Sequence, residues 1–199
     1  VTITTNGVLL KDCLSQLEDI GIDGINISLD TLNPEIYEKM TRRNEFSQVW
    51  DAIVAAQSSK IRTKINCVLL KGINDHEFFD LIHLARDYQL DARFIEIMPI
   101  GPGNGFEGFD KKDLLEKIAE KYPDYQIEHK KHGNGPASYV NIPGFKGSIG
   151  FIDAIHGKFC DQCNRIRLTS DGILKLCLYY ENGIDLKKYL RSETSSEEI

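Results

Sequence analysis

Residues 62–98, RTKINCVLLKGINDHEFFDLIHLARDYQLDARFIEIM, decide the predicted fold because they contain one complete strand–helix–strand unit. Arg62–Leu70 is predicted to form a strand, and Glu77–Tyr88 a helix with apolar residues at helical spacing. Ala92–Met98 is predicted to form the next strand. Consecutive strands that are joined through a helix are typical of a parallel sheet. The segment therefore predicts an α/β fold.

The residues before this unit repeat the same alternation. Strands are predicted at Val1–Thr5 and Gly24–Leu29, and helices at Lys11–Ile20, Pro34–Thr41 and Phe46–Ser59. The chain up to residue 101 is therefore predicted to be a series of βα units in one parallel sheet.

The predicted strands carry polar side chains on one face. A parallel sheet covered by helices on both sides should be apolar on both faces, and a packed barrel interior should be filled with branched apolar side chains. The pattern therefore predicts an open or partial barrel whose inner face lines a ligand-binding cavity, with a half-exposed mixed sheet as the alternative. The polar-face residues, each aligned within its own strand, are Thr2, Thr4, Asn6, Asn26, Ser28, Asp30, Lys64, Asn66, Glu96 and Met98.

After Pro99 the pattern changes. A glycine-rich loop is followed by a predicted helix at Lys111–Lys121 and by a loop at Lys130–Pro136, whose two lysines and His132 are expected to be solvated. The remaining predicted elements are strands at Tyr125–His129, Ser138–Ile142 and Gly147–Ile152 and a closing helix at Asp185–Leu190. The predicted domains are therefore the barrel part, residues 1–101, and a β-rich part, residues 102–199.

The segment Phe159–Leu178, FCDQCNRIRLTSDGILKLCL, concentrates three of the five cysteines. Its strand patterns at Arg165–Thr169 and Ile173–Leu178 flank the turn sequence Ser-Asp-Gly, which predicts a hairpin. Folding the hairpin back is expected to bring Cys177 close to the C-x-x-C pair, Cys160 and Cys163.

Three thiolates are compatible with more than one metal. His156 lies four residues before Cys160 and could complete a Cys₃His zinc site. A [4Fe–4S] cluster usually takes four cysteines, and with three it leaves one iron open to a ligand. A redox-active C-x-x-C pair is a third alternative. Cys13 and Cys67 lie in apolar patterns and are predicted to be buried free thiols.

Composition narrows the functional class. The 199 residues are 41% hydrophobic and carry a formal net charge of −6, so non-specific nucleic-acid binding is not indicated. No apolar run is long enough to span a bilayer, and no secretion signal is visible, so no membrane partner and a cytoplasmic location are predicted. The chain opens on Val1 inside a strand pattern and stops at Ile199 in a helix-like run, so a fragment of a longer protein is expected.

Five segments, TTNG, NISLD, KINCVLLKGIND, RFIEIMPIG and FCDQCNRIRLTSDGILKLCL, occur in this order. With them the chain resembles the molybdenum cofactor biosynthesis protein A family, radical S-adenosylmethionine enzymes also called GTP 3′,8-cyclases. The resemblance covers essentially the whole chain and is most specific in C-x-x-C-N-R-x-R. It implies the second half of a partial (β/α) TIM-like barrel followed by a small β-rich cluster-binding region. The family's N-terminal C-x-x-x-C-x-x-C motif and its glycine-rich tail are not in this sequence.

The resemblance also implies individual roles. A [4Fe–4S] cluster that binds the purine of GTP at its open iron would be held by Cys160, Cys163 and Cys177. Further GTP contacts would be Thr4, Lys64, Arg165, Ile166 through its backbone, and Arg167. Contacts to S-adenosylmethionine would be Ser28 and Met98.

Simpler alternatives stand beside these roles. Arg165 and Arg167 could be ordinary surface charges on a hairpin. Lys64, on an otherwise apolar strand, needs an anionic partner, which could be an internal ion pair with Asp30 or Glu96. Arg93 matches an arginine of the family, but plain alternation places it opposite Met98, and its role stays open.

The activity that the resemblance implies for the full-length enzyme is radical cyclisation of GTP to 3′,8-cyclo-7,8-dihydro-GTP, the first step of molybdenum cofactor biosynthesis. It uses S-adenosylmethionine and a second [4Fe–4S] cluster in the missing N-terminal part, so this fragment alone is expected to be inactive. Implied partners are GTP, S-adenosylmethionine, a second copy in a homodimer, and cyclic pyranopterin monophosphate synthase downstream. The alternatives are a zinc-stabilised, non-catalytic binding module and another radical S-adenosylmethionine enzyme with an auxiliary cluster.

Overall fold

The computed structural model describes residues 1–129, 132–133, 135–156, 163, 165–180 and 182–191. The chain divides into two compact units, Val1–Phe159 and Cys160–Ile199, which are described separately below. The predicted division at residue 101 marks where the strand–helix repeat ends and stays a prediction. Lys130, Lys131 and Cys160, each named in the sequence analysis, lie outside the described residues.

The first unit is built on a seven-stranded sheet. Its strand order is β1-β2-β3-β4-β7-β6-β5. The first five of these strands run parallel to one another, and β6 and β5 continue the sheet in antiparallel pairs. The α/β prediction is therefore confirmed. The strands are β1 (Thr2–Thr5), β2 (Gly24–Ser28), β3 (Arg62–Cys67), β4 (Leu90–Ile95), β5 (Gln126–Glu128), β6 (Ser138–Asn141) and β7 (Ile149–Ile152).

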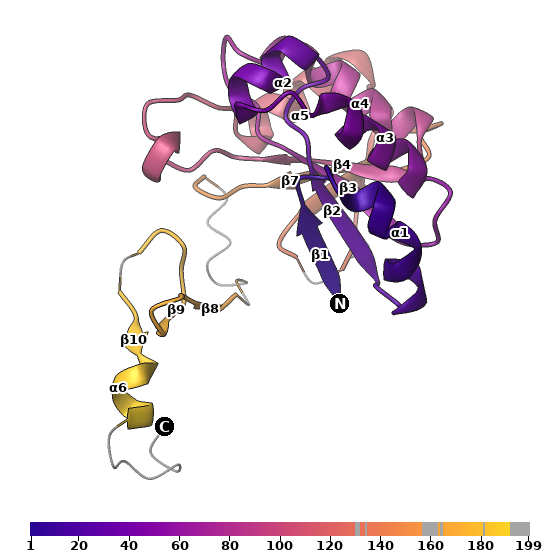
Figure 1. Cartoon of the computed structure of the whole chain (residues 1–199). Helices are drawn as coiled ribbons and strands as arrows, with labels where there is room; N and C mark the ends of the chain where they lie inside the picture. The colour runs from indigo at the N-terminus through magenta and orange to yellow at the C-terminus, as the bar shows by residue number, and fades with distance from the viewer. Residues whose placement is uncertain (130–131, 134, 157–162, 164, 181, 192–199) are drawn as a thin grey trace. The chain divides into compact units, whose positions relative to one another are not determined.

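The helices of this unit lie on one side of the sheet (Figure 1). The strand residues that face them, such as Ile27, Ile65 and Phe94, are almost completely buried and form one core with helix residues such as Ile53 and Ile82. Burying a side chain of this size stabilises the fold by about 1.5–3 kcal/mol. The opposite sheet face is therefore free to carry polar groups. The helices are α1 (Leu10–Asp19), α2 (Pro34–Thr41), α3 (Phe46–Ala56), α4 (Phe78–Asp87) and α5 (Lys111–Lys121), with 3₁₀ turns η1 (Asp75–Glu77) and η2 (Gly101–Gly103).

One of the two cysteine predictions for this unit is wrong. Cys67 is buried in β3, as predicted, and burial raises the pKa of its thiol well above the ordinary value. Cys13, in contrast, is exposed on α1. The residues of α1 that pack against the core are Leu10, Leu14 and Leu17, and Cys13 lies beside that stripe rather than on it.

The second unit contains the predicted hairpin. Its strands β8 (Arg167–Leu168) and β9 (Ile173–Lys175) are antiparallel, and the Gly172 N–H donates to the Thr169 carbonyl at 3.0 Å. Gly172 has a φ of 83°, a conformation that glycine adopts without strain. The hairpin prediction is confirmed, although both strands are shorter than expected. The unit also contains β10 (Ile184–Asp185) and α6 (Leu186–Arg191).

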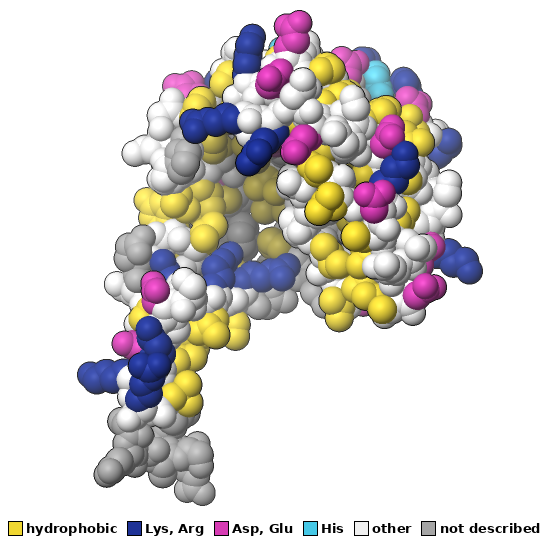
Figure 2. Space-filling model, in the orientation of Figure 1, with side chains coloured by type: hydrophobic (Ala, Val, Ile, Leu, Met, Phe, Trp, Pro, Cys, Tyr) yellow, Lys and Arg dark blue, Asp and Glu magenta, His cyan; other side chains and the backbone are white. Residues whose placement is uncertain are grey.

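The outer surface gives no sign of a membrane segment. Among the described residues, no helix has the length and apolar character needed to cross a bilayer. On the face of the first unit that Figure 2 shows, basic and acidic side chains are interspersed rather than gathered by sign. Two cations, Lys64 and Arg93, are instead buried on the sheet face opposite the helices.

Candidate functional site

Five side chains form a connected polar face on the sheet of the first unit: Thr4, Asn26, Lys64, Asp91 and Arg93. Strand register aligns the first four of them across β1, β2, β3 and β4. The Asn26 amide donates to Thr4 Oγ1 at 3.1 Å, and Arg93 Nη2 donates to Asn26 Oδ1 at 2.6 Å. We call this set the polar face. It brings together two of the residues implied to bind GTP, Thr4 and Lys64.

Lys64 is the central cation of the polar face. Its residue is only 9% exposed, and its ammonium donates a hydrogen bond to the main-chain carbonyl of His132. Burial, together with the nearby charges of Arg93 and Arg62, lowers the pKa of Lys64 to about 8, although Asp91 opposes this shift. An anionic ligand beside this lysine would stabilise the charged form of its ammonium group.

The two ion-pair partners suggested for Lys64 from the sequence are engaged elsewhere, and that alternative is wrong. Asp30 Oδ1 accepts the backbone N–H of Val68 at 2.8 Å. Burial also raises the pKa of the Asp30 carboxyl group. Glu96 accepts the backbone N–H of His156 and pairs with its imidazole. Lys64 is therefore not held by either carboxylate.

Arg93 belongs to the polar face, which answers the question that the sequence left open. It is 8% exposed, and its Nε is buried without a hydrogen-bond partner among the described residues. Because β4 ends at Ile95, alternation cannot be counted through to Met98. In the sequence, Asp91 and Arg93 are two residues apart within a strand, and this spacing predicts that they lie on the same face of the sheet.

Gly150 on β7 makes room for this arrangement. A Cβ atom there would lie 2.7 Å from Cε1 of Tyr139 and 2.8 Å from Cγ of Arg93. We expect Gly150→Ala to lower the free energy of unfolding by about 1–3 kcal/mol, because both side chains must shift. Denaturant unfolding of the variant would measure the loss. Wild-type stability in that experiment would show that Tyr139 and Arg93 move aside easily.

His132 was expected to be solvated, and this prediction is wrong. The residue is 7% exposed and its ring stacks on Tyr139 with centroids 4.1 Å apart. Its Nδ1 lies 3.0 Å from Asp91 Oδ2, and its Nε2 lies 2.7 Å from Glu128 Oε1. Arg62 also reaches Asp91, at 3.1 Å. The partners come from separate segments, which a loop-like sequence pattern does not reveal.

Ser28 and Met98 lie toward the carboxyl ends of the parallel strands. Ser28 is the exposed last residue of β2, and Met98 is half-buried in the segment after β4. In open α/β sheets, ligands bind outside this end of the strands. The positions suit a bound cofactor, and the assignment to S-adenosylmethionine stays a prediction.

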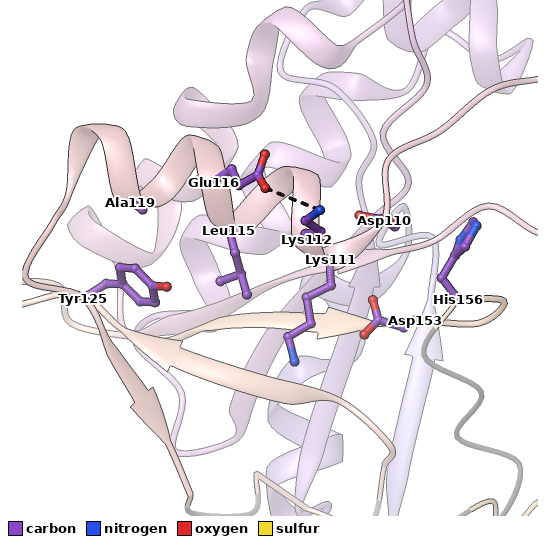
Figure 3. Close-up of a pocket in the computed structure, with 9 residues that line it drawn as sticks. All are labelled: Asp110, Lys111, Lys112, Leu115, Glu116, Ala119, Tyr125, Asp153 and His156. Atoms are coloured by element: carbon purple, nitrogen blue, oxygen red, sulfur yellow. Dashed lines mark ion pairs between the residues drawn. The ribbon is translucent and has the colours of Figure 1, made fainter.

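Two further hollows mark the surface of the first unit. One of about 410 Å³ lies along α5 and is shown in Figure 3, where Tyr125 is at one end and His156 at the other. It contains an ion pair between Lys112 and Glu116 at 3.9 Å, and no residue that the family resemblance singled out for GTP or S-adenosylmethionine lines it. The second, about 620 Å³, lies against the His132 cluster at the start of β3 and β4.

The cysteine hairpin of the second unit suits a metal-binding thiolate. The Tyr179 N–H donates to Cys177 Sγ at 3.3 Å. Backbone N–H groups of Tyr180 and Tyr179, together with the charge of Arg167, lower the pKa of the Cys177 thiol. The thiolate is the form that ligates zinc and iron. Within the described residues, which do not include Cys160, no group of three His, Cys, Asp or Glu side chains could hold a metal ion.

The hairpin register relates the arginines to the third cysteine. The ladder pairs Arg167 with Lys175 and Leu168 with Leu174. Cys177 follows two residues after Lys175, and Cys163 precedes Arg167 by four residues. Both Cys163 and Cys177 are free and half-buried. Arg165 and Ile166 are exposed, while Arg167 is half-buried. Cys163, Cys177 and the two arginines thus lie in or next to the hairpin in sequence, and their convergence on one cluster stays a prediction.

The zinc alternative also required His156. The hydrogen bond and charge of Glu96 raise the pKa of His156. A raised pKa favours the protonated ring, whereas a metal ligand must be the neutral imidazole. Metal-ligating histidines also commonly pair their other ring nitrogen with a carboxylate, so the contact of Nδ1 with Glu96 leaves the Cys₃His alternative open.

Comparison with known families decides the relationship. The sequence model described as Molybdenum Cofactor Synthesis C matches residues 90–199, and that of the Radical SAM superfamily matches residues 1–85. The chain belongs to the Molybdenum Cofactor Synthesis C family. The Radical SAM match adds a superfamily whose chemistry uses S-adenosylmethionine and iron–sulfur clusters.

Curated relatives of this family carry consistent names. A GTP 3′,8-cyclase of Clostridium perfringens (strain 13) is 41% identical over the whole chain and 62% of its own length. A GTP 3′,8-cyclase of Peptoclostridium acidaminophilum is 42% identical over 96% of the chain and 59% of its own length. The molybdenum cofactor biosynthesis protein moc-5 of Caenorhabditis elegans is 41% identical over the whole chain and 34% of its own length. The chain thus spans about three fifths of the bacterial relatives it matches.

Among solved structures, one of TYW1 with a lysine-pyruvate adduct bound is 17% identical, with a TM-score of 0.47. The match covers 65% of this chain and 43% of that one. This likeness is too weak to support an argument about the site.

Proposed function

We propose that the full-length protein is a GTP 3′,8-cyclase, which converts GTP to 3′,8-cyclo-7,8-dihydro-GTP in the first step of molybdenum cofactor biosynthesis. The family match and the names of the relatives support this proposal. When bound, S-adenosylmethionine and iron–sulfur clusters would supply the radical chemistry. The protein's share of the chemistry is to hold GTP in position and to keep water away.

The observation that carries the proposal is the buried positive charge of the polar face. Lys64 and Arg93 are buried, and Arg93 and the exposed Arg62 lie close enough to Lys64 to lower its pKa, in a chain whose net charge is −6. Of the acidic groups nearby, Asp91 is already shared between Arg62 and His132. Buried cations need anionic partners, and a nucleoside triphosphate provides several.

Each predicted site residue then has a role. Lys64 would bind the phosphates of GTP, and Thr4 would make a further contact. Arg165 and Arg167 would bind GTP through their guanidinium groups and Ile166 through its backbone. A [4Fe–4S] cluster with one open iron for the purine would be held by Cys160, Cys163 and Cys177. S-adenosylmethionine would contact Ser28 and Met98.

The wider setting follows from the same proposal. A second [4Fe–4S] cluster would belong to the part of the relatives' length that this chain does not span. The product would pass to cyclic pyranopterin monophosphate synthase, the enzyme would work in the cytoplasm, and a homodimer is the proposed assembly. Gel filtration of the full-length protein would test the last point.

The lowered pKa of Lys64 makes GTP binding dependent on pH. Between about pH 8 and its ordinary pKa of 10.5, Lys64 is neutral in the folded protein and charged in the unfolded chain. The stability of the free protein should therefore rise with pH in this window, because the unfolded state binds the extra proton. A polyanion favours the charged ammonium, so affinity for GTP should fall as the pH rises through about 8.

Calorimetric titration near pH 8.5 in two buffers of different ionisation enthalpy would detect the proton that Lys64 takes up on binding. Lys64→Met should abolish this uptake. Uptake that survives in the variant would assign the proton to another group.

Equilibrium binding tests the proposed function itself. The anaerobically reconstituted full-length protein should bind GTP at one site, more tightly than it binds ATP or guanosine. Equal affinity for GTP and ATP would contradict a cluster that recognises guanine specifically. Equal affinity for GTP and guanosine would contradict the role of the polar face.

A further inference from the structure

The segment at His132 lies directly on the ammonium of Lys64. The His132 carbonyl accepts the hydrogen bond of Lys64 Nζ, and a Cβ at Gly133 would lie 3.6 Å from that nitrogen. Among the described hydrogen bonds, this carbonyl provides the only one that the ammonium makes. Contacts that hold the His132 carbonyl in place therefore also hold the ammonium of Lys64 in place.

The His132 ring is anchored on three sides. Asp91 and Glu128 face its two nitrogens at 3.0 and 2.7 Å, and the Tyr139 ring stacks on its face. Tyr139 also faces Lys64, whose Nζ is 5.9 Å from the ring centroid. The anchors come from β4, β5 and β6, so the segment is tied to the sheet and not only to its own loop.

Lys64 needs such an anchor because its neighbours repel it. Arg62 and Arg93 both oppose its charge. A lysine side chain is long and flexible, and it turns its charged end toward water when nothing holds it. The hydrogen bond to the His132 carbonyl keeps the ammonium of Lys64 on the polar face instead.

We infer that His132 is a positioning residue for Lys64. Its docked ring holds the main-chain carbonyl that keeps the ammonium on the polar face, ready for the phosphates of GTP. The inference rests on the proposed function, since it assigns to His132 an effect on GTP binding that acts through Lys64.

A double-mutant cycle on the full-length protein tests this coupling. With Lys64 present, His132→Ala should weaken GTP binding about tenfold, and in a Lys64→Met background it should cost less than about twofold. Guanosine affinity should change little in either background. His83→Ala is the matched control, because it removes a half-buried histidine that contacts Tyr122 on the helix side. It should leave GTP affinity unchanged.

A second variant guards against loss of folding. Glu128→Ala removes one anchor of the ring from a side chain that is 20% exposed. It should weaken GTP binding about threefold, again only when Lys64 is present. The inference would be overturned if GTP affinity fell equally in both backgrounds, did not fall, or rose. None of these outcomes would affect the proposed function. A wild-type protein that fails to bind GTP would overturn the proposed function and this inference together.

Discussion

Replacing Cys177 with serine in the full-length protein is expected to remove about four irons and four sulfides per chain. It is also expected to reduce GTP binding below detection. The reason is that Cys177 is one of three proposed ligands and stands in a backbone setting that favours its thiolate. A serine hydroxyl has a far higher pKa and does not replace a thiolate ligand. Iron and acid-labile sulfide assays on anaerobically reconstituted protein, followed by GTP titration, would measure both effects.

The control for this experiment is Cys13→Ser. Cys13 is also a free cysteine, but it is exposed on α1. Its replacement should leave iron, sulfide and GTP affinity unchanged. The zinc-stabilised module would instead be supported if the wild-type protein held about one zinc at the hairpin, and if Cys177→Ser lost this zinc without a change in iron. Normal GTP binding by a Cys177→Ser protein that lacks the cluster would remove the cluster from substrate recognition.

The second large effect is expected from Lys64→Met. Methionine keeps the length and the apolar stem of lysine and deletes the charge. A hydrogen bond to a charged group is worth about 1.5–3 kcal/mol, so GTP affinity should fall by about 10- to 150-fold. Guanosine affinity should fall much less, because the phosphates are the proposed partners. Parallel titrations with GTP, GDP, GMP and guanosine would show how the loss depends on phosphate number.

The same substitution should not harm the fold. The buried Lys64 ammonium carries a desolvation cost, seen in its lowered pKa, and it lies beside two arginines. Removing it should leave the melting temperature of the ligand-free protein equal or raise it. Lys11→Met is the control, because Lys11 pairs with Asp51 on the exposed side of the helices. Equal losses of GTP and guanosine affinity in Lys64→Met would contradict a role in phosphate binding.

Local signals in the sequence were sufficient for most of the fold. Helices α2 and α5 begin and end where predicted, since Asn33 and Asp110 cap their first turns with hydrogen bonds to backbone N–H groups. The turn at Gly172 was enough to predict the hairpin. Alternation in β2 and β3 was enough to predict a polar sheet face, because side chains change sides at every residue of a strand.

The candidate site was harder to predict where it depends on contacts between distant segments. His132 looked like a solvated loop residue, yet Asp91, Glu128 and Tyr139 bury it. The role of Arg93 stayed open in the sequence analysis because alternation was counted from Met98, which lies past the end of β4. The burial of His132 could not be predicted without knowing its partners in space, whereas the spacing of Asp91 and Arg93 was readable from the sequence.

Turnover of GTP by the full-length, anaerobically reconstituted protein tests the central claim most directly. The assay contains S-adenosylmethionine and a strong reductant, and it measures 5′-deoxyadenosine, residual GTP and products. A cyclase should form 5′-deoxyadenosine in step with the loss of GTP, and the product should have the same mass as GTP because cyclisation and reduction balance in hydrogen. Formation of 5′-deoxyadenosine at the same rate without GTP, with GTP recovered unchanged, would contradict the proposed function.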